Sequence, residues 1–151
     1  MQKIKNKTMA IIIAAILTIS IGTPILIVPD ALAAYPPFQT FAFLNVAPHP
    51  AGLGQTVTIG MWLAQPPPTA NGPYGDRWTN FKLTITKPDS TTETLGPFTS
   101  DDTGGTYTTY TPNQLGNYTF LFTYPGQTLS GNNLNPTATA FTKAYIGTYF
   151  G

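Results

Sequence analysis

The chain has 151 residues, a formal net charge of +1 and only 9% charged residues, which suits a single domain with a real core. It contains no cysteine, so disulfides, thiolate metal sites and cysteine nucleophiles are excluded. Lys3, Lys5 and Lys7 stand at the extreme N-terminus and no basic patch follows them, so a nucleic-acid partner is not expected.

Residues 1–33 are predicted to be an export signal. The three lysines precede the uncharged, mostly aliphatic run Met9–Val28, and the cleavage-type sequence Ala31-Leu32-Ala33 follows it. The run is also long enough for an uncleaved membrane anchor, and a buried core helix is the third interpretation. Under the first two, the rest of the chain is extracellular or at the cell surface and meets a membrane only through its N-terminal segment.

Residues 34–37 are expected to be a stiff linker, because Tyr35-Pro36-Pro37 favours an extended backbone. Residues 38–151 alternate short Thr-rich and aromatic runs with turn signals, without a helical period, and so predict one all-β domain. The expected strands are Phe38–Val46, Gln55–Ala64, Trp78–Lys87, Thr91–Leu95, Phe98–Ser100, Thr106–Thr111, Tyr118–Tyr124 and a weakly patterned Thr137–Phe150. This spacing is typical of an immunoglobulin-like antiparallel β-sandwich of about seven strands.

The longest irregular segment, residues 65–75, holds three consecutive prolines and two glycine turns. Long loops on rigid β scaffolds often carry binding. A candidate contact surface is therefore formed by Trp62, Pro67, Tyr74 and Trp78. The alternative is that the loop only crosses between sheets and that the aromatic residues pack in the core or at a sheet edge.

Catalytic and metal-binding patterns are weak. The single histidine, His49, lies in a Pro-His-Pro turn and is interpreted as a loop residue. The turn Asp101-Asp102 is interpreted as a solvated hairpin, with calcium binding as the alternative. No phosphate loop, dinucleotide fingerprint or Ser-His-Asp set can be assembled, so we expect no enzyme activity and no cofactor or metal.

The segment Gly116-Asn117-Tyr118-Thr119-Phe120 carries two signals. Tyr118 stands where immunoglobulin-like domains have their tyrosine corner, a structural hydrogen bond from a Tyr near the start of a strand to nearby backbone. Asn117 begins an Asn-Tyr-Thr sequon and is a candidate glycosylation site.

A longer pattern carries a family resemblance. Residues 47–128 contain G-x-x-V-x-I-x-x-W-L, then D-R-W-x-x-F-x-L-T-I-T-K-P-D, then G-x-Y-x-F and Y-P-G-Q. This run resembles an immunoglobulin-like module of secreted archaeal proteins, a module that commonly precedes a β-propeller related to PQQ-binding repeats. The resemblance implies an exported scaffold, here expected as a stand-alone or truncated version without the propeller.

Two functional hypotheses follow. The first is a non-catalytic secreted or cell-surface immunoglobulin-like module for adhesion or structural contacts with an unknown protein or glycan. The alternative is a subunit of a fibre or surface layer, which self-associates when its C-terminal segment adds as a strand to a neighbour's open sheet edge.

Overall fold

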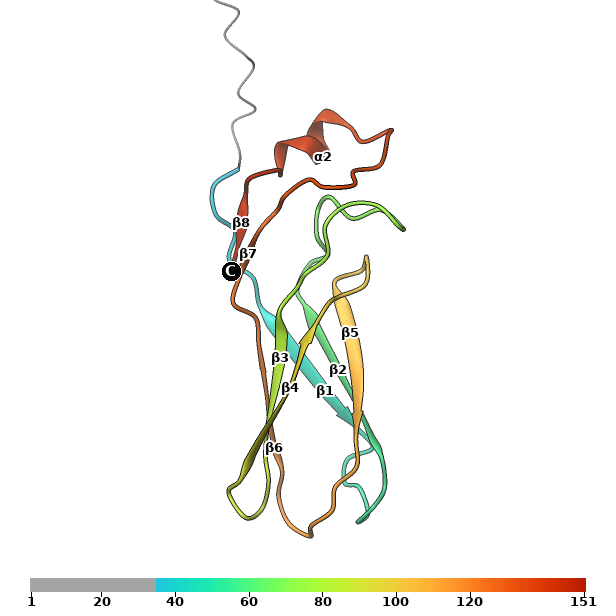
Figure 1. Cartoon of the computed structure of the whole chain (residues 1–151), viewed down its shortest axis with the longest axis vertical. Coiled ribbons are helices and arrows are strands. Elements are labelled where there is room, and N and C mark those ends of the chain that lie inside the picture. Colours follow the sequence, from blue (N-terminus) through green and yellow to red (C-terminus); the bar gives the residue numbers. More distant parts are fainter. Residues whose placement is uncertain (1–34) are drawn as a thin grey trace, which may run out of the picture. The chain divides into compact units, whose positions relative to one another are not determined.

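The computed structural model describes residues 35–151, which belong to one compact unit, and the predicted export segment lies outside these described residues. This part of the chain is all-β with one short helix, as predicted for the class (Figure 1). The elements are β1 (Ala42–Ala47), β2 (Val57–Leu63), β3 (Phe81–Thr86), β4 (Thr92–Phe98), β5 (Gly105–Tyr110), β6 (Thr119–Thr123), β7 (Gln127–Thr128), α2 (Ala140–Ala144) and β8 (Tyr149–Phe150).

The six longer strands form two antiparallel sheets of three strands each. One sheet has the order β1-β2-β5 and the other the order β4-β3-β6. The strands β7 and β8 form a third, antiparallel pair. Within residues 35–151, β1, β5, β4 and β6 are therefore edge strands.

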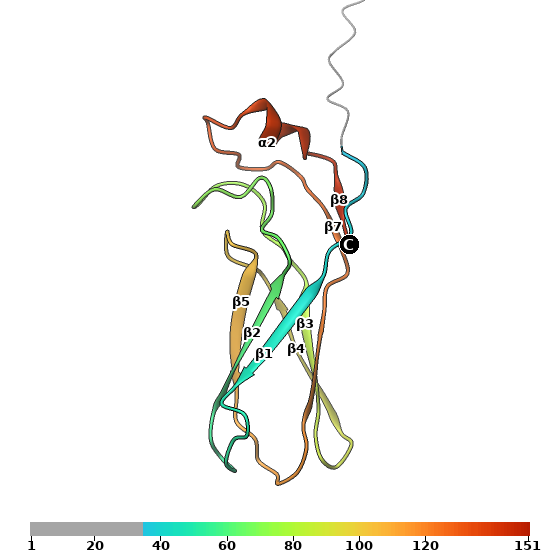
Figure 2. The same ribbon diagram turned by 180° about the vertical axis from the view of Figure 1, so that it is seen from behind.

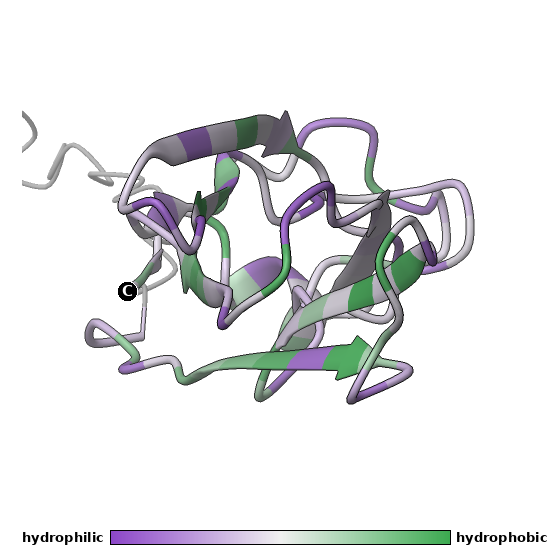
Figure 3. Ribbon diagram, turned by 90° about the horizontal axis from the view of Figure 1, so that it is seen from below, coloured by the Kyte–Doolittle hydropathy of each residue, from purple (hydrophilic) through white to green (hydrophobic). Residues whose placement is uncertain are grey.

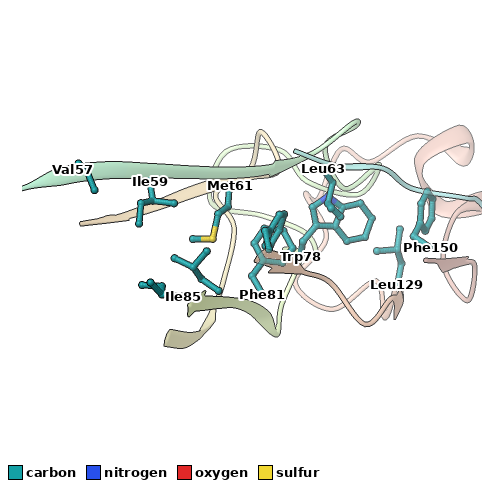
Figure 4. Close-up of a cluster of buried hydrophobic side chains, with 11 residues drawn as sticks. Val57, Ile59, Met61, Leu63, Trp78, Phe81, Ile85, Leu129 and Phe150 are labelled. Atoms are coloured by element: carbon teal, nitrogen blue, oxygen red, sulfur yellow. The ribbon is translucent and has the colours of Figure 1, made fainter. Parts of the chain in front are cut away.

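The core consists of buried side chains that lie between the two larger sheets and extend to β8 (Figure 4). In β2 the predicted inward face is confirmed, because its apolar residues at alternate positions are buried while Thr58 and Trp62 are exposed. β3 alternates in the same way, with Phe81, Leu83 and Ile85 buried. The buried set is Val57, Ile59, Met61, Leu63, Trp78, Phe81, Leu83, Ile85, Phe122, Leu129 and Phe150.

The predicted break in the fourth strand is wrong, because β4 runs through Gly96-Pro97 to Phe98. The pairing of β3 with β4 shifts register between Phe81 and Leu83, so the strand accommodates an irregularity there. Gly96 has a φ of 118°, which glycine adopts without a Cβ clash. Proline is tolerated at this position because an edge strand can lack an N–H donor on its open side.

The prediction of a strand over residues 137–150 is wrong for most of that range. The helix α2 interrupts it, and the side-chain oxygen of Thr139 caps the helix by accepting the N–H of Thr142 at 3.3 Å. Threonine is favourable at an N-cap position even though it favours strands elsewhere. Only β8 at the end of the range is a strand.

The strand β8 lies between β7 and residues 38–40, two segments that are far apart in the sequence (Figures 1 and 2). On one side it pairs antiparallel with β7, and on the other it runs parallel to residues 38–40. Three backbone hydrogen bonds hold the parallel side. The N–H of Phe38 donates to the carbonyl of Tyr149 at 2.8 Å, and the N–H of Gly151 donates to the carbonyl of Phe38 at 3.0 Å. The N–H of Thr40 donates to the carbonyl of Gly151 at 3.1 Å. The predicted linker also contacts the domain, because the ring of Tyr35 lies 4.5 Å from that of Tyr145.

Candidate contact surfaces

The four residues predicted as one contact surface do not come together. Trp78 is fully buried and its indole N–H donates to the carbonyl of Gln65 at 3.0 Å, while its ring packs 5.3 Å from that of Phe150. The side chain of Pro67 is also fully buried. These two assignments are therefore wrong, because the loop folds back over the core and covers both side chains. Of the four, only Trp62 is an exposed large residue, and Tyr74 is half-buried.

Trp62 belongs instead to an aromatic patch on the outer face of the sheet β1-β2-β5. Phe43 on β1 stands directly opposite Trp62, and their rings stack at 5.8 Å with an interplanar angle of 14°. Tyr107 on β5 pairs with Gly60, two residues before Trp62. The exposed fractions of Phe43, Trp62 and Tyr107 are 45%, 40% and 72%. We call these three residues the aromatic face.

The aromatic face lies on a sheet without charge. None of its strands β1, β2 and β5 contains Asp, Glu, Lys or Arg. Figure 3 colours the described chain by hydropathy, and green, pale and purple segments alternate along its strands. Gly60 lies between the residues of the aromatic face and has no side chain, so the ring of Trp62 can lie close to its backbone. A Cβ added at Gly60 would lie 3.8 Å from that ring. The patch therefore lacks charge, and stacking holds Phe43 against Trp62.

A second unusual feature is the outer edge of β6. Among residues 35–151 this strand pairs only with β3. Its sequence Thr-Phe-Leu-Phe-Thr has no charge, proline or glycine, although exposed edges in natural proteins usually carry such protection. The opposite edge of the same sheet, β4, has Glu93, Pro97 and an irregular register. The two edges of one sheet thus differ in how they are protected.

A pocket of about 200 Å³ lies where the end of β1 meets the start of β6. Its walls include Val46 from β1, Phe120 from β6, and Tyr118 just before it. Leu53 and Leu115, both exposed, stand among its lining residues. His49 lines the same pocket, as a loop residue. The core is thus less completely covered at this end.

Tyr118 makes the hydrogen bond that a tyrosine corner requires. Its hydroxyl accepts the backbone N–H of Gln114 at 3.0 Å and is 3.4 Å from the carbonyl of the same residue. The side chain of the sequon residue Asn117 is exposed, and Asn117 also lines the pocket. The corner therefore fixes the chain at the pocket mouth, next to the candidate glycosylation site.

Asp76, the most buried carboxylate within residues 35–151, has an internal structural role. Its oxygens accept the hydroxyl of Ser130 at 2.6 Å, the N–H of Gly131 at 3.0 Å and the hydroxyl of Thr69 at 2.8 Å. Burial alone raises the pKa of Asp76, but the hydrogen bonds from Ser130, Thr69 and Gly131 outweigh it, so the pKa lies below its ordinary value. A carboxylate that is ionised and fully hydrogen-bonded is a clamp between two loops and a poor proton acceptor.

The turn at residues 101–105 also satisfies its own carboxylate. Asp101 accepts the N–H and the hydroxyl of Thr103 at 2.9 and 2.7 Å, and the N–H of Gly105 at 3.1 Å. The hydrogen bond from the Thr103 side chain is the largest cause of the lowered pKa of Asp101. Within residues 35–151, no group of three His, Cys, Asp or Glu side chains comes close enough to hold a metal ion.

Sequence reasoning missed Phe43, Tyr107 and the β6 edge. One signal was present, because Trp62 falls among Thr58 and Gly60 on the outward face of its strand. Strand pairing was needed to place Phe43 and Tyr107 beside it. None of the helices in the described part of the chain has the length and apolar character needed to cross a membrane. No protein family model, curated protein or solved structure matches this chain.

Proposed function

We propose that the chain is an exported, non-catalytic immunoglobulin-like module that makes structural protein contacts at the cell surface. The immunoglobulin-like assignment is supported by two three-stranded antiparallel sheets that share one core and by the Tyr118 corner bond. The position of β8 supports it as well, because a final strand of such a domain lies next to the first and the penultimate strands.

The aromatic face is the observation that carries the proposed contact function. Aromatic residues are enriched among the side chains that dominate binding energy at protein interfaces. Phe43 and Trp62 are already stacked against each other, so little side-chain freedom is lost when a partner covers them. The surrounding strands carry no charge that would have to be desolvated.

A protein partner fits this face better than a glycan. Sugar recognition uses several convergent hydrogen-bonding groups beside the aromatic rings, whereas the outward positions around Gly60 offer only Asn45, Thr58 and Thr109 as polar side chains. These lie on three adjacent strands of one sheet, and none of them lines the pocket beside Tyr118. A glycan remains the competing outcome of the test.

Site-resolved cross-linking tests the proposal. A photo-reactive phenylalanine analogue is placed at Tyr107 in the full chain, and at Phe141 on α2 as a control, since both side chains are exposed and aromatic. We expect cross-links to one discrete envelope protein from position 107 and none to it from position 141. Equal labelling from both positions, or attachment only to carbohydrate, would contradict a protein contact through the aromatic face.

Export has its own test. N-terminal sequencing of the protein recovered outside the cell should begin near Ala34 if the signal is cleaved after Ala33. Recovery of a membrane-bound form that starts at Met1 would favour the anchor. Recovery of the chain only from the cytoplasm would refute export.

The second candidate function is an assembly subunit joined by strand addition. The unprotected edge of β6 favours it. The C-terminal segment is a costly donor, because Phe150 is buried and stacks on Phe38 at 5.1 Å within its own domain. Size-exclusion chromatography at several concentrations tests assembly, and a strictly monomeric protein would refute it.

A further inference from the structure

We propose that the outer edge of β6 and the pocket beside it accept an extended, uncharged segment of another polypeptide chain, with apolar side chains at every second position. This inference rests on the assembly function proposed above. It adds the acceptor edge, the direction of the incoming strand and the chemistry of its side chains.

The outer edge of β6, which pairs with no other strand of residues 35–151, supplies the first argument. An edge strand presents a row of free N–H and C=O groups that pair readily with another strand. β6 lacks every residue type that natural edges use against such pairing. β4, on the other side of the same sheet, carries Glu93 and Pro97. The protection is therefore placed on one edge of the sheet and missing from the other.

The strand β8 indicates the direction. It runs antiparallel to β7, which follows β6, and parallel to residues 38–40, which precede β1. A strand that lies beside β6 and runs in the direction of β8 would therefore be antiparallel to β6. It would pass from the Tyr124 end of β6 toward Phe120. Antiparallel strand addition is a common mode of peptide recognition.

The pocket sets the side-chain chemistry at the far end of this path. Val46 and Phe120 are partly exposed although both pack against the core, and they line the pocket together with Tyr118. A bulky apolar side chain placed there would complete the coverage of the core. Since side chains alternate along a strand, apolar residues at every second position would face the core and polar residues would face water.

The strands β1 and β6 beside the path contain no charged residue, which argues for a largely uncharged occupant. A charged side chain beside these strands would lose hydration without gaining an ion pair. Near the Tyr124 end, Lys82 on β3 is exposed and stands opposite Thr123. The segment proposed is thus similar in composition to this chain's own strands, in which Thr alternates with apolar residues.

Peptide binding to the full exported chain tests the inference. The probe is a short synthetic peptide in which Thr alternates with Val and which ends in Leu. The control peptide has the same composition but with its Val residues contiguous. Hydrogen exchange by NMR reads out the β6 amides that point away from β3. With the alternating peptide we expect them to exchange about tenfold more slowly, equivalent to ~1.4 kcal/mol, and the control peptide should have no effect.

Protein variants locate the binding. The double substitution Leu53→Lys and Leu115→Lys alters two exposed residues of the pocket, and Phe141→Lys makes the same kind of change on α2. We expect the double variant to weaken peptide binding about tenfold, or ~1.4 kcal/mol, and the α2 variant to leave it unchanged. Equal binding by all three proteins, or equal effects of both peptides, would overturn the inference.

Two further outcomes identify the donor. Protection of the β6 amides that rises with protein concentration, without peptide, would support the inference with a second copy of this chain as donor. Protection that is complete at every concentration would overturn it, because the edge would then be covered by the chain's own residues. None of these results depends on the aromatic face, so cross-linking from position 107 can succeed or fail independently.

Discussion

The two ends of the core are covered in different ways. At the closed end, Trp78, Leu129 and Phe150 have at most 1% of their surface exposed. Trp78 is hydrogen-bonded to Gln65 of the loop at residues 65–75, and Phe150 belongs to β8. At the open end, Val46 and Phe120 pack against the same core but remain partly exposed beside a pocket. From this difference in coverage we expect side chains at the closed end to contribute more to stability than those at the open end.

The sharpest test of this contrast replaces each of the two tryptophans with alanine. Trp78→Ala should lower the free energy of unfolding by about 3–5 kcal/mol, because it leaves a cavity at the closed end and the carbonyl of Gln65 without its donor. Trp62→Ala removes an exposed ring and should cost below about 1 kcal/mol. Chemical denaturation measures both, and similar losses for the two variants would refute the contrast.

The carboxylate clamp at the closed end should give the next largest effect. Asp76→Asn weakens the bonds to Ser130 and Gly131 and should cost about 2–3 kcal/mol at neutral pH. Because the folded pKa of Asp76 is lowered, its contribution is present above the unfolded pKa of about 3.9 and is lost as the pH falls through the folded value.

The pH dependence supplies the control for this substitution. The difference in unfolding free energy between the wild type and Asp76→Asn should shrink as the pH falls below about 4. Urea titrations at a series of pH values measure it. A difference that stays constant into the acid range would show that the charge of Asp76 does not contribute.

A smaller loss is expected at the corner near the open end. Tyr118→Phe removes the hydroxyl that accepts the N–H of Gln114 while it keeps the ring. The expected cost is about 1 kcal/mol, the net value of one hydrogen bond. Thermal unfolding measures it, with Tyr107→Phe as the control because no hydrogen bond of the Tyr107 hydroxyl is found among the described residues and its side chain is exposed. An effect as large as that of Trp78→Ala would contradict the distinction between the ends.

The smallest effect is expected on the open edge itself. Leu121 is 57% exposed on the outer side of β6, so Leu121→Thr should change the unfolding free energy by no more than about 0.5 kcal/mol. Differential scanning calorimetry suffices. A substantial loss, independent of protein concentration, would mean that this edge is already covered within the chain.

Most strands could be predicted from the sequence, because the alternation of apolar and polar residues and the turn residues act over a few neighbouring positions. The alternation of β2 places Ile59 and Met61 inward whatever partner the strand has. The turn at Pro88-Asp89-Ser90 forms as expected, with the N–H of Ser90 donating to the carbonyl of Lys87 at 2.9 Å. Such signals extend over a few residues and do not depend on the fold.

The candidate surfaces depend on long-range contacts, which these patterns do not contain. The burial of Trp78 requires Gln65 and the close approach of Gly104, whose added Cβ would lie 3.3 Å from the indole nitrogen. The helix α2 forms in a Thr-rich segment because Thr139 caps it. The aromatic face appears only when β1 and β5 take their registers beside β2.

The side-by-side arrangement of residues 38–40 and β8 has a mechanical consequence. Because the two segments are parallel, a pull on the chain before Phe38 and an opposite pull at Gly151 would slide them past each other. Their three backbone bonds then carry the force together and cannot open one at a time. Resistance to such a pull is governed by the rate of unfolding rather than by equilibrium stability. The domain should therefore withstand tension along its ends better than its small β8 pairing suggests.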